Sequence, residues 1–308
     1  MEKDRLFESH VDIIKYKVLR ELARQTWAGR DAFMAFNDIA NVVVKKGEPP
    51  SRCCIYKDRA VIAERIRIGL GEYHGSKDTV QVVSIACDEC PKSGHVVTSL
   101  CRGCLAHPCK EVCPKDAVTL DRTNGRSKID PDKCIRCGQC ANVCAYHAII
   151  IQERPCAAAC GMDAIHSDMN GKADIDYNKC VSCGQCLVNC PFGAIADKSQ
   201  IFQLARALSE GEQIIAEIAP AFTGQFGDNI NARNLKEALE ELGFSQVYEV
   251  ALGADIGAVA EAHHYVEKVA TGELPFLLTS CCPSWAMLAK KYFPDMIDEV
   301  SQELTPMV

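Results

Sequence analysis

The spacing of the cysteines constrains this chain more than any other feature. Sixteen of its twenty cysteines lie between Cys87 and Cys190. Two groups have the spacing Cys-x2-Cys-x2-Cys-x3-Cys, and a third has the longer form Cys-x2-Cys-x4-Cys-x3-Cys. Their members are Cys134, Cys137, Cys140 and Cys144; Cys180, Cys183, Cys186 and Cys190; and Cys101, Cys104, Cys109 and Cys113. Such a loop brings three thiolates to one iron–sulfur cube while the fourth reaches a neighbouring cube, so the pattern predicts an electron-transfer protein.

The four other cysteines of this region form two shorter pairs, Cys87-x2-Cys90 and Cys156-x3-Cys160. The segment 155–160 repeats the pattern of 108–113, with a proline before the first cysteine in both. It is typical of half a ferredoxin unit whose first two cysteines are missing, and we expect Cys87 and Cys90 to supply them. The sixteen cysteines then divide into about four 4Fe-4S cubes.

We expect adjacent units to exchange their fourth cysteines. The predicted ligand sets are Cys101, Cys104, Cys109 and Cys144; Cys134, Cys137, Cys140 and Cys113; Cys180, Cys183, Cys186 and Cys160; and Cys87, Cys90, Cys156 and Cys190. Two alternatives remain open. The two regular groups can exchange with each other, and Cys87-x2-Cys90 together with Cys101-x2-Cys104 is also compatible with a zinc ribbon. We expect the adjacent Cys53 and Cys54 to be structural, and His107 to pack inside its cysteine loop.

Length, composition and charge limit the class of protein. A chain of 308 residues is long enough for two or three domains. The N-terminus has no apolar secretory segment, and no uncharged apolar run approaches the roughly 18 residues of a membrane span. We therefore expect a soluble cytoplasmic protein without a membrane partner, whose reduced thiols serve as metal ligands rather than disulfides. The net charge of −7 argues against nucleic acid as a partner.

The first 75 residues are expected to be helical. Apolar residues at three- and four-residue spacing predict a helix that includes Val11, Ile14, Val18 and Leu22. Further helices are predicted over 31–46 and 56–70. The last of these carries four basic residues, which we expect to form a solvated face; a docking patch for an acidic partner is the alternative. They are Lys57, Arg59, Arg65 and Arg67.

A short strand over 80–86 is predicted to lead into the cysteine-rich domain, which we place at 76–198 as ferredoxin-like and α+β. From residue 199 the pattern changes to alternating helices and strands. Strands are predicted over 213–218, 246–251 and 275–278, and helices over 201–208, 234–242 and 258–270. This alternation predicts the first part of an α/β domain with a parallel sheet over 199–308, and reactive groups gather at the carboxyl ends of such strands.

The segment Thr279-Ser280-Cys281-Cys282-Pro283-Ser284-Trp285 follows the last predicted strand. It resembles the first signature of the iron–iron hydrogenases, whose fuller form is TSCCPxW. The resemblance extends upstream through 218–222, 226–228, 242–244 and 253–255, and downstream through 292–295. The cysteine-rich half resembles the monomeric, ferredoxin-linked branch of that family.

The resemblance implies roles for particular residues. Cys282 matches the thiolate that holds the cubane of the H-cluster, and Cys281 matches the thiol that passes protons at that centre. Ala219 and Pro220 match the backbone that lies against the diatomic ligands of the cluster. Glu261 and Ser301 fall on proton-relay positions, and His264 stands where a second glutamate is usual. An imidazole can shuttle protons near neutral pH, although a polar helix surface is the alternative for this histidine.

Two further signatures of the family, with the other three cysteines of the H-cluster, are not found in this chain. We therefore expect an incomplete hydrogenase that binds four cubes and transfers electrons but does not evolve hydrogen by itself; the H-cluster is expected only in a full-length protein. The implied partners are ferredoxin or a similar low-potential carrier and, for a full-length protein, the hydrogenase maturation machinery. The alternative function is a stand-alone polyferredoxin. A hydrogen sensor is a third possible function, but the sequence has no sensory or signalling module to support it.

Overall fold

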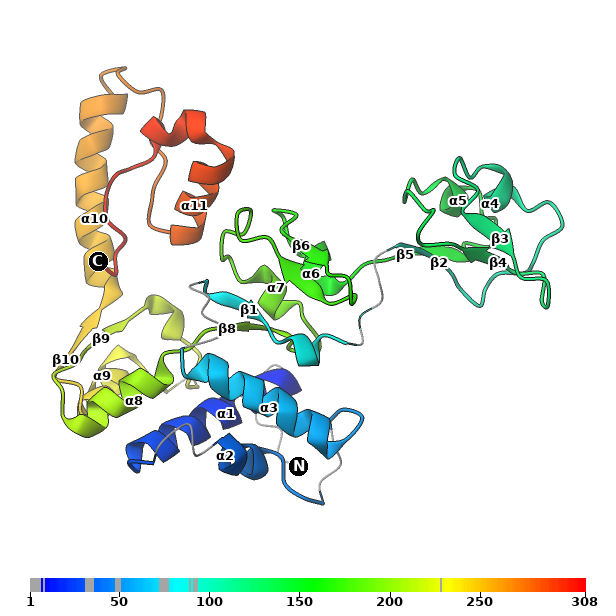
Figure 1. Cartoon of the computed structure of the whole chain (residues 1–308). Coiled ribbons are helices and arrows are strands. Elements are labelled where there is room, and N and C mark those ends of the chain that lie inside the picture. Colours follow the sequence, from blue (N-terminus) through cyan, green and yellow to red (C-terminus); the bar gives the residue numbers. More distant parts are fainter. Residues whose placement is uncertain are drawn as a thin grey trace.

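The computed structural model describes residues 7, 9–30, 36–47, 51–71, 78–88, 90, 94–227 and 229–308. Figure 1 shows an N-terminal group of helices, two small units with short strands, and a C-terminal region of helices with a pair of short strands. None of the helices described is both long enough and apolar enough to cross a membrane.

Three helices form the N-terminal group: α1 (His10–Trp27), α2 (Phe36–Val43) and α3 (Ile55–Gly69). Their apolar faces meet around the fully buried Leu22, Ile39 and Ile66. The predicted first and third helices are confirmed. Of the second, 36–43 is helical, and 31–35 lies outside the described residues.

The basic residues of α3 do not form one solvated face. The guanidinium of Arg65 is buried and donates to the carbonyl oxygen of Gly193 at 2.6 Å. Arg59 donates to a backbone carbonyl of 44, and Lys57 forms an ion pair with Asp88. The expectation of a solvated face is wrong for these residues, because they bind other parts of the chain; Arg67 remains exposed.

Two units have the same order of strands and α-helices, and each joins its first and last strands as an antiparallel pair. In the unit that we call the inserted unit, the elements are β2 (Gly94–Val97), α4 (Pro108–Glu111), β3 (Val118–Leu120), β4 (Ser127–Ile129), α5 (Gln139–Asn142) and β5 (Ile149–Gln152). In the other, the outer unit, they are β1 (Val80–Val82), η1 (Ser84–Ala86), α6 (Pro155–Ala158), β6 (Ile165–Ser167), β7 (Ala173–Ile175), α7 (Gln185–Val188) and β8 (Ile195–Asp197).

The inserted unit interrupts the outer unit. The chain begins the outer unit with β1, builds the whole inserted unit over 94–152, and returns at Pro155 with α6. Figure 1 shows the inserted unit standing away from the rest of the molecule. The insertion explains why the half-unit 155–160 has its first two cysteines more than sixty residues earlier in the chain. The strand predicted over 80–86 is shorter than expected, because 84–86 is a 3-10 turn that redirects the chain toward Cys87.

The C-terminal region alternates helices and strands as predicted, up to residue 249. Its elements are α8 (Ile201–Glu210), β9 (Ile215–Ile218), η2 (Pro220–Phe222), α9 (Ala232–Glu241), β10 (Gln246–Glu249), α10 (Val250–His264), the π-helical turn η3 (Tyr265–Val269), α11 (Pro283–Tyr292) and η4 (Pro294–Glu299). Strands β9 and β10 are parallel. Helix α8 packs on the N-terminal helices, and its Gln203 donates to the carbonyl of Leu70 at 2.6 Å.

Two predicted elements differ from the structure. Helix α10 begins directly after β10, eight residues before the predicted start, although Gly253 and Gly257 lower the helix propensity of this stretch. The strand predicted over 275–278 is reduced to one parallel bridge between Leu278 and Val300. Pro275 has no N–H to donate, which disfavours a longer ladder.

Candidate iron–sulfur sites

A repeated turn follows the last cysteine of each group. The residue three positions after it has a positive φ: Asp116 (46°), His147 (48°), Asp163 (47°) and Gly193 (57°). The next residue then donates its backbone N–H to the cysteine sulfur: Ala117 to Cys113 at 3.2 Å, Ala148 to Cys144 at 3.4 Å, Ala164 to Cys160 at 3.4 Å and Ala194 to Cys190 at 3.2 Å. Hydrogen bonds to sulfur favour the thiolate form that binds iron and tune the potential of an iron–sulfur centre.

The first cysteine set lines a cavity of about 260 Å³ in the inserted unit. Its members are Cys101, Cys104, Cys109 and Cys144. Burial raises the pKa of Cys101, but backbone hydrogen bonds from Gly103 and Ser127 lower it overall. The site therefore stabilises a thiolate.

The second set surrounds a separate, small cavity of the inserted unit and contains Cys113, Cys134, Cys137 and Cys140. Burial raises the pKa of Cys140, and the neighbouring Cys134 and Cys113 add to the effect. His95 lines the same cavity, is 7% exposed, and has no hydrogen-bond partner at either ring nitrogen among the described residues. An imidazole N–H without a protein acceptor fits a group rich in sulfur.

The third set lies in the outer unit and contains Cys160, Cys180, Cys183 and Cys186. Burial raises the pKa of Cys186 to about 11, and the thiolates of Cys180 and Cys160 contribute. Four thiols around one cavity repel each other as anions, which is the environment that a cluster of iron cations neutralises.

The fourth set combines cysteines from both ends of the insertion: Cys87, Cys90, Cys156 and Cys190. Burial raises the pKa of Cys156 to about 11, with a further contribution from the thiolate of Cys190. The backbone N–H of Ala173 donates to the sulfur of Cys87 at 3.3 Å. Arg154 also donates to that sulfur, at 3.6 Å.

Three of the expected sets each line a cavity of their own, and the cysteines of the fourth lie in or beside the core of the outer unit, which is compatible with the preferred ligation. Cys87 and Cys90 lie beside Cys156 of the outer unit, whereas Cys101 and Cys104 line a cavity of the inserted unit, an arrangement that favours the iron–sulfur ligation over a zinc ribbon. Among the described residues, no group of three or more His, Cys, Asp or Glu side chains could hold a single metal ion. Four thiols spaced around a cavity fit a 4Fe-4S cube, whose irons each take one thiolate.

The hydrogenase-like motif lies beside the end of the chain. Leu278 N donates to the carbonyl of Glu299 at 2.7 Å, and Ser301 N donates to the carbonyl of Leu278 at 2.7 Å. Ser301 is therefore buried next to the segment that leads to Cys281 and Cys282, which are both exposed. Cys282 directly precedes α11.

The other predicted hydrogenase residues have no hydrogen bond to Cys281 among the described residues. Glu261 and His264 lie one turn apart on α10 and are half-buried, while Ala219 and Pro220 follow β9 and are exposed. Within the described part of the chain, no hydrogen bond joins Cys281 to Glu261, His264 or Ser301. The two thiols of 199–308 do not make the four-thiolate site of a cubane, so these residues alone do not hold the H-cluster.

Helix α11 connects this motif to the third cysteine set. Its Lys291 donates to the carbonyl of Cys180 at 2.6 Å and to that of Tyr177 at 3.0 Å. The hydroxyl of Tyr292 donates to the carbonyls of Met162 and Lys179 at 3.3 and 3.4 Å. One short helix therefore spans from Cys282 to the loops of the third set.

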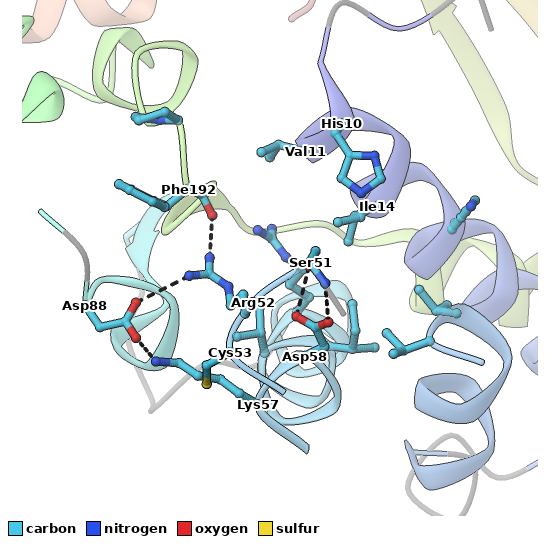
Figure 2. Close-up of a pocket in the computed structure, with 17 residues that line it drawn as sticks. His10, Val11, Ile14, Ser51, Arg52, Cys53, Lys57, Asp58, Asp88 and Phe192 are labelled. Atoms are coloured by element: carbon cyan, nitrogen blue, oxygen red, sulfur yellow. Dashed lines mark hydrogen bonds and ion pairs between the residues drawn. The ribbon is translucent and has the colours of Figure 1, made fainter. Parts of the chain in front are cut away.

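A cavity of about 580 Å³ separates the N-terminal helices from the loop after Cys190. Figure 2 shows Arg52 in this cavity donating to Asp88 and to the carbonyl of Phe192, the latter at 2.9 Å, while Lys57 pairs with the same aspartate. Cys53 lines the cavity and is exposed.

The sequence did not reveal that Arg52, Arg65 and Arg154 lie near the fourth set, because a single arginine has no periodic signal. Arg154 precedes Pro155-Cys156 at the position where His107 precedes Pro108-Cys109.

Comparisons with known protein families agree with this geometry. Residues 212–308 match the family described as iron only hydrogenase large subunit, C-terminal domain. Residues 151–201 match the LdpA Fe-S cluster-binding domain, and residues 127–149 match a 4Fe-4S binding domain.

Individual relatives cover different parts of the chain. Iron hydrogenase 1 of Clostridium pasteurianum is 30% identical over 216 residues, which are 65% of this chain and 36% of that protein. The periplasmic Fe hydrogenase large subunit of Nitratidesulfovibrio vulgaris is 30% identical over 120 residues, 36% of this chain and 28% of that protein. A ferredoxin of Alicyclobacillus acidocaldarius is 43% identical over 58 residues, which are 19% of this chain and 72% of the ferredoxin.

The matching part of this chain spans about a third of the length of its hydrogenase relatives. The units with repeated cysteine turns belong to the ferredoxin-type iron–sulfur proteins and bind multiple 4Fe-4S clusters. Over 212–308 the chain is similar to the iron–iron hydrogenases, so a hydrogenase-like region follows these units.

Proposed function

We propose that this protein moves electrons through four 4Fe-4S centres to the region around Cys282, as the electron-transfer part of an iron–iron hydrogenase that exchanges electrons with ferredoxin. The four cysteine sets described above are the proposed ligands. The proposed domains are a helical region over 1–75, the cluster-binding domain over 76–198, and the first part of the catalytic domain over 199–308.

The contact of α11 with the third set is the observation that supports this function best. Lys291 and Tyr292 hold the helix against the backbone of Cys180 and its neighbours, and Cys282 stands at the other end of the same helix. A helix of ten residues is roughly 15 Å long, so the third centre would lie within one short helix of Cys282. A stand-alone electron carrier has no need for this arrangement.

In this proposal Cys282 is a cluster ligand, and Cys281, Glu261, His264 and Ser301 serve proton transfer. The H-cluster, when bound in a protein with all its ligands, supplies the metal site at which protons and electrons combine. The burial of Ser301 beside the segment 278–280 supports its part in a path shielded from bulk water.

The test is anaerobic reconstitution of the whole chain with iron and sulfide, followed by metal analysis and low-temperature spin resonance. About sixteen irons per chain, no stoichiometric zinc, and spectra of interacting reduced cubes are expected. Cys183→Ser should weaken the third centre and slow electron delivery from reduced ferredoxin to an acceptor attached at Cys282. Far fewer irons, or one zinc per chain, would contradict the proposed ligation.

A second candidate function is a polyferredoxin that carries electrons without hydrogen chemistry. It is favoured by the 43% identity of one segment to a ferredoxin. The double variant Lys291→Met and Tyr292→Phe, which should detach α11 from the third set, separates the two functions. For a polyferredoxin, the rate of electron transfer between the protein and its partner would not change. The hydrogenase proposal expects slower electron transfer to the acceptor at Cys282.

A further inference from the structure

Arg154 is almost completely enclosed at the junction where the chain returns from the inserted unit. It is 1% exposed. One end of its guanidinium donates to the sulfur of Cys87 at 3.6 Å and the other to the carbonyl of Gly171 at 2.6 Å. Its Nε has no hydrogen-bond partner within the described structure. A buried cation in contact with a cysteine sulfur is costly unless a negative group lies beside it.

A second buried arginine approaches the same cysteine set from the opposite part of the chain. Arg65, on α3, is 7% exposed and donates to the carbonyl of Gly193, three residues after Cys190. Burial lowers the pKa of Arg65 to about 10, and the thiolate of Cys190 opposes this shift, so the guanidinium stays charged at neutral pH. The N-terminal helices thus deliver a positive charge to the loop of the fourth set.

The buried positive charge lies beside the fourth cysteine set alone. Among the residues that the structure describes, Arg65 and Arg154 are the two arginine or lysine residues that are buried, and both face the fourth set. The carboxylates near Arg65 have other partners. Asp88 pairs with Arg52 and Lys57, Asp197 lies 4.0 Å from the Nζ of Lys15, and Asp58 accepts hydrogen bonds from Ser51. The cations near the other sets, such as Arg126 and Lys291, lie at the surface, where water screens them.

We propose that Arg154 and Arg65 raise the reduction potential of the centre held by Cys87, Cys90, Cys156 and Cys190 above those of the other three centres. Reduction of a cube adds one electron to a group that already carries negative charge. A buried cation stabilises the reduced form more than the oxidised form, since their interaction with it differs by a full charge in a medium of low dielectric constant. The fourth centre is therefore reduced first and holds the electron longest.

This inference rests on the proposed ligand set, so the experiment tests the two separately. The reconstituted whole chain is titrated with dithionite and redox mediators, and each centre is followed by low-temperature spin resonance. Cys156→Ser identifies the signal of the fourth centre by its loss or change. Arg154→Gln and Arg65→Gln are then titrated beside Arg154→Lys, which keeps the charge. Arg206→Gln is the matched control, since Arg206 is exposed on α8 and pairs with Glu210.

The expected result is a shift of the fourth centre alone to more negative potential in both glutamine variants, with the iron content unchanged. Arg154→Lys should restore most of the potential, and Arg206→Gln should leave every centre unshifted. If Arg154→Gln loses iron, the potential of the fourth centre in Arg65→Gln still measures the effect of removing one buried positive charge. Unshifted potentials in variants that keep all their iron would overturn this inference while leaving the ligand set intact. Four unchanged signals in Cys156→Ser would overturn the ligand set itself.

Discussion

The Nζ of Lys291 donates a hydrogen bond of 2.6 Å to the carbonyl oxygen of Cys180. This bond joins the last turn of α11 to a loop that presents cysteines of the third set. A cation at the C-terminal end of a helix also interacts favourably with the helix dipole. The ammonium group of Lys291 therefore interacts both with the end of α11 and with the carbonyl oxygen of Cys180. The relationship fixes the orientation of the hydrogenase-like region on the outer unit.

Replacement of Lys291 by methionine should loosen this contact. The loss of hydrogen bonds at an exposed position costs about 1 kcal/mol, so α11 should detach more often without unfolding the outer unit. Hydrogen–deuterium exchange should increase at 177–180 and along α11. The matched control is Lys290→Met, because the neighbouring lysine is exposed and, among the described residues, has no hydrogen bond or ion pair from its side chain to the outer unit. Equal exchange in both variants would show that the bond does not hold the helix.

Substitution of Gly193 by alanine should destabilise the junction between the N-terminal helices and the outer unit. Gly193 has φ of 57°, and a Cβ there would overlap Val11 and meet the guanidinium of Arg65. We expect a loss of about 2 kcal/mol from backbone strain and overpacking together. Gly184→Ala is the control, since Gly184 has φ of 80° but no atom within 4 Å of the added Cβ. Thermal unfolding of the two variants separates strain from overlap; equal losses would mean that Val11 and Arg65 move aside freely.

Local patterns in the sequence predicted the parts of the fold that local chemistry determines. The apolar repeat through Val18 and Leu22 forms a buried helix face, and the cysteine spacing indicated the 4Fe-4S cofactors. The strand over 275–278 was not formed, because strand pairing depends on a distant neighbour and the pattern of a single segment does not reveal it. The role of α3 in reaching Gly193 also depends on a contact across 128 residues of sequence.

The nested arrangement of the two units shows the same limit. The echo between 155–160 and 108–113 indicated that Cys87 and Cys90 serve a distant half-unit. The position of Arg154 between Cys87 and Gly171 follows only from the folded chain, since one arginine in a short connection has no repeat to mark it. Long-range electrostatic contacts of this kind were the part of the site that sequence reasoning could not reach.

The left-handed residue after Cys160 should control the third centre. Asp163 has φ of 47°, which aspartate tolerates but a β-branched residue does not. Asp163→Val should cost about 2 kcal/mol and turn the N–H of Ala164 away from the sulfur of Cys160. Asp163→Gly keeps the conformation and is the matched control. Faster loss of iron from the third centre in the valine variant alone, measured by chelator challenge, is expected; equal loss in both variants would contradict the role of the turn.

The buried His95 should tune the second centre. Neither ring nitrogen has a hydrogen-bond partner in the described part of the chain, and the ring lines the cavity of Cys113, Cys134, Cys137 and Cys140. An N–H donated to sulfur stabilises the reduced form of a cluster, so His95→Leu should shift the second centre to more negative potential with no loss of iron. His166→Leu provides the control, since His166 is exposed on β6. If spin-resonance titration gives the same potential for the second centre in both variants, His95 only fills space.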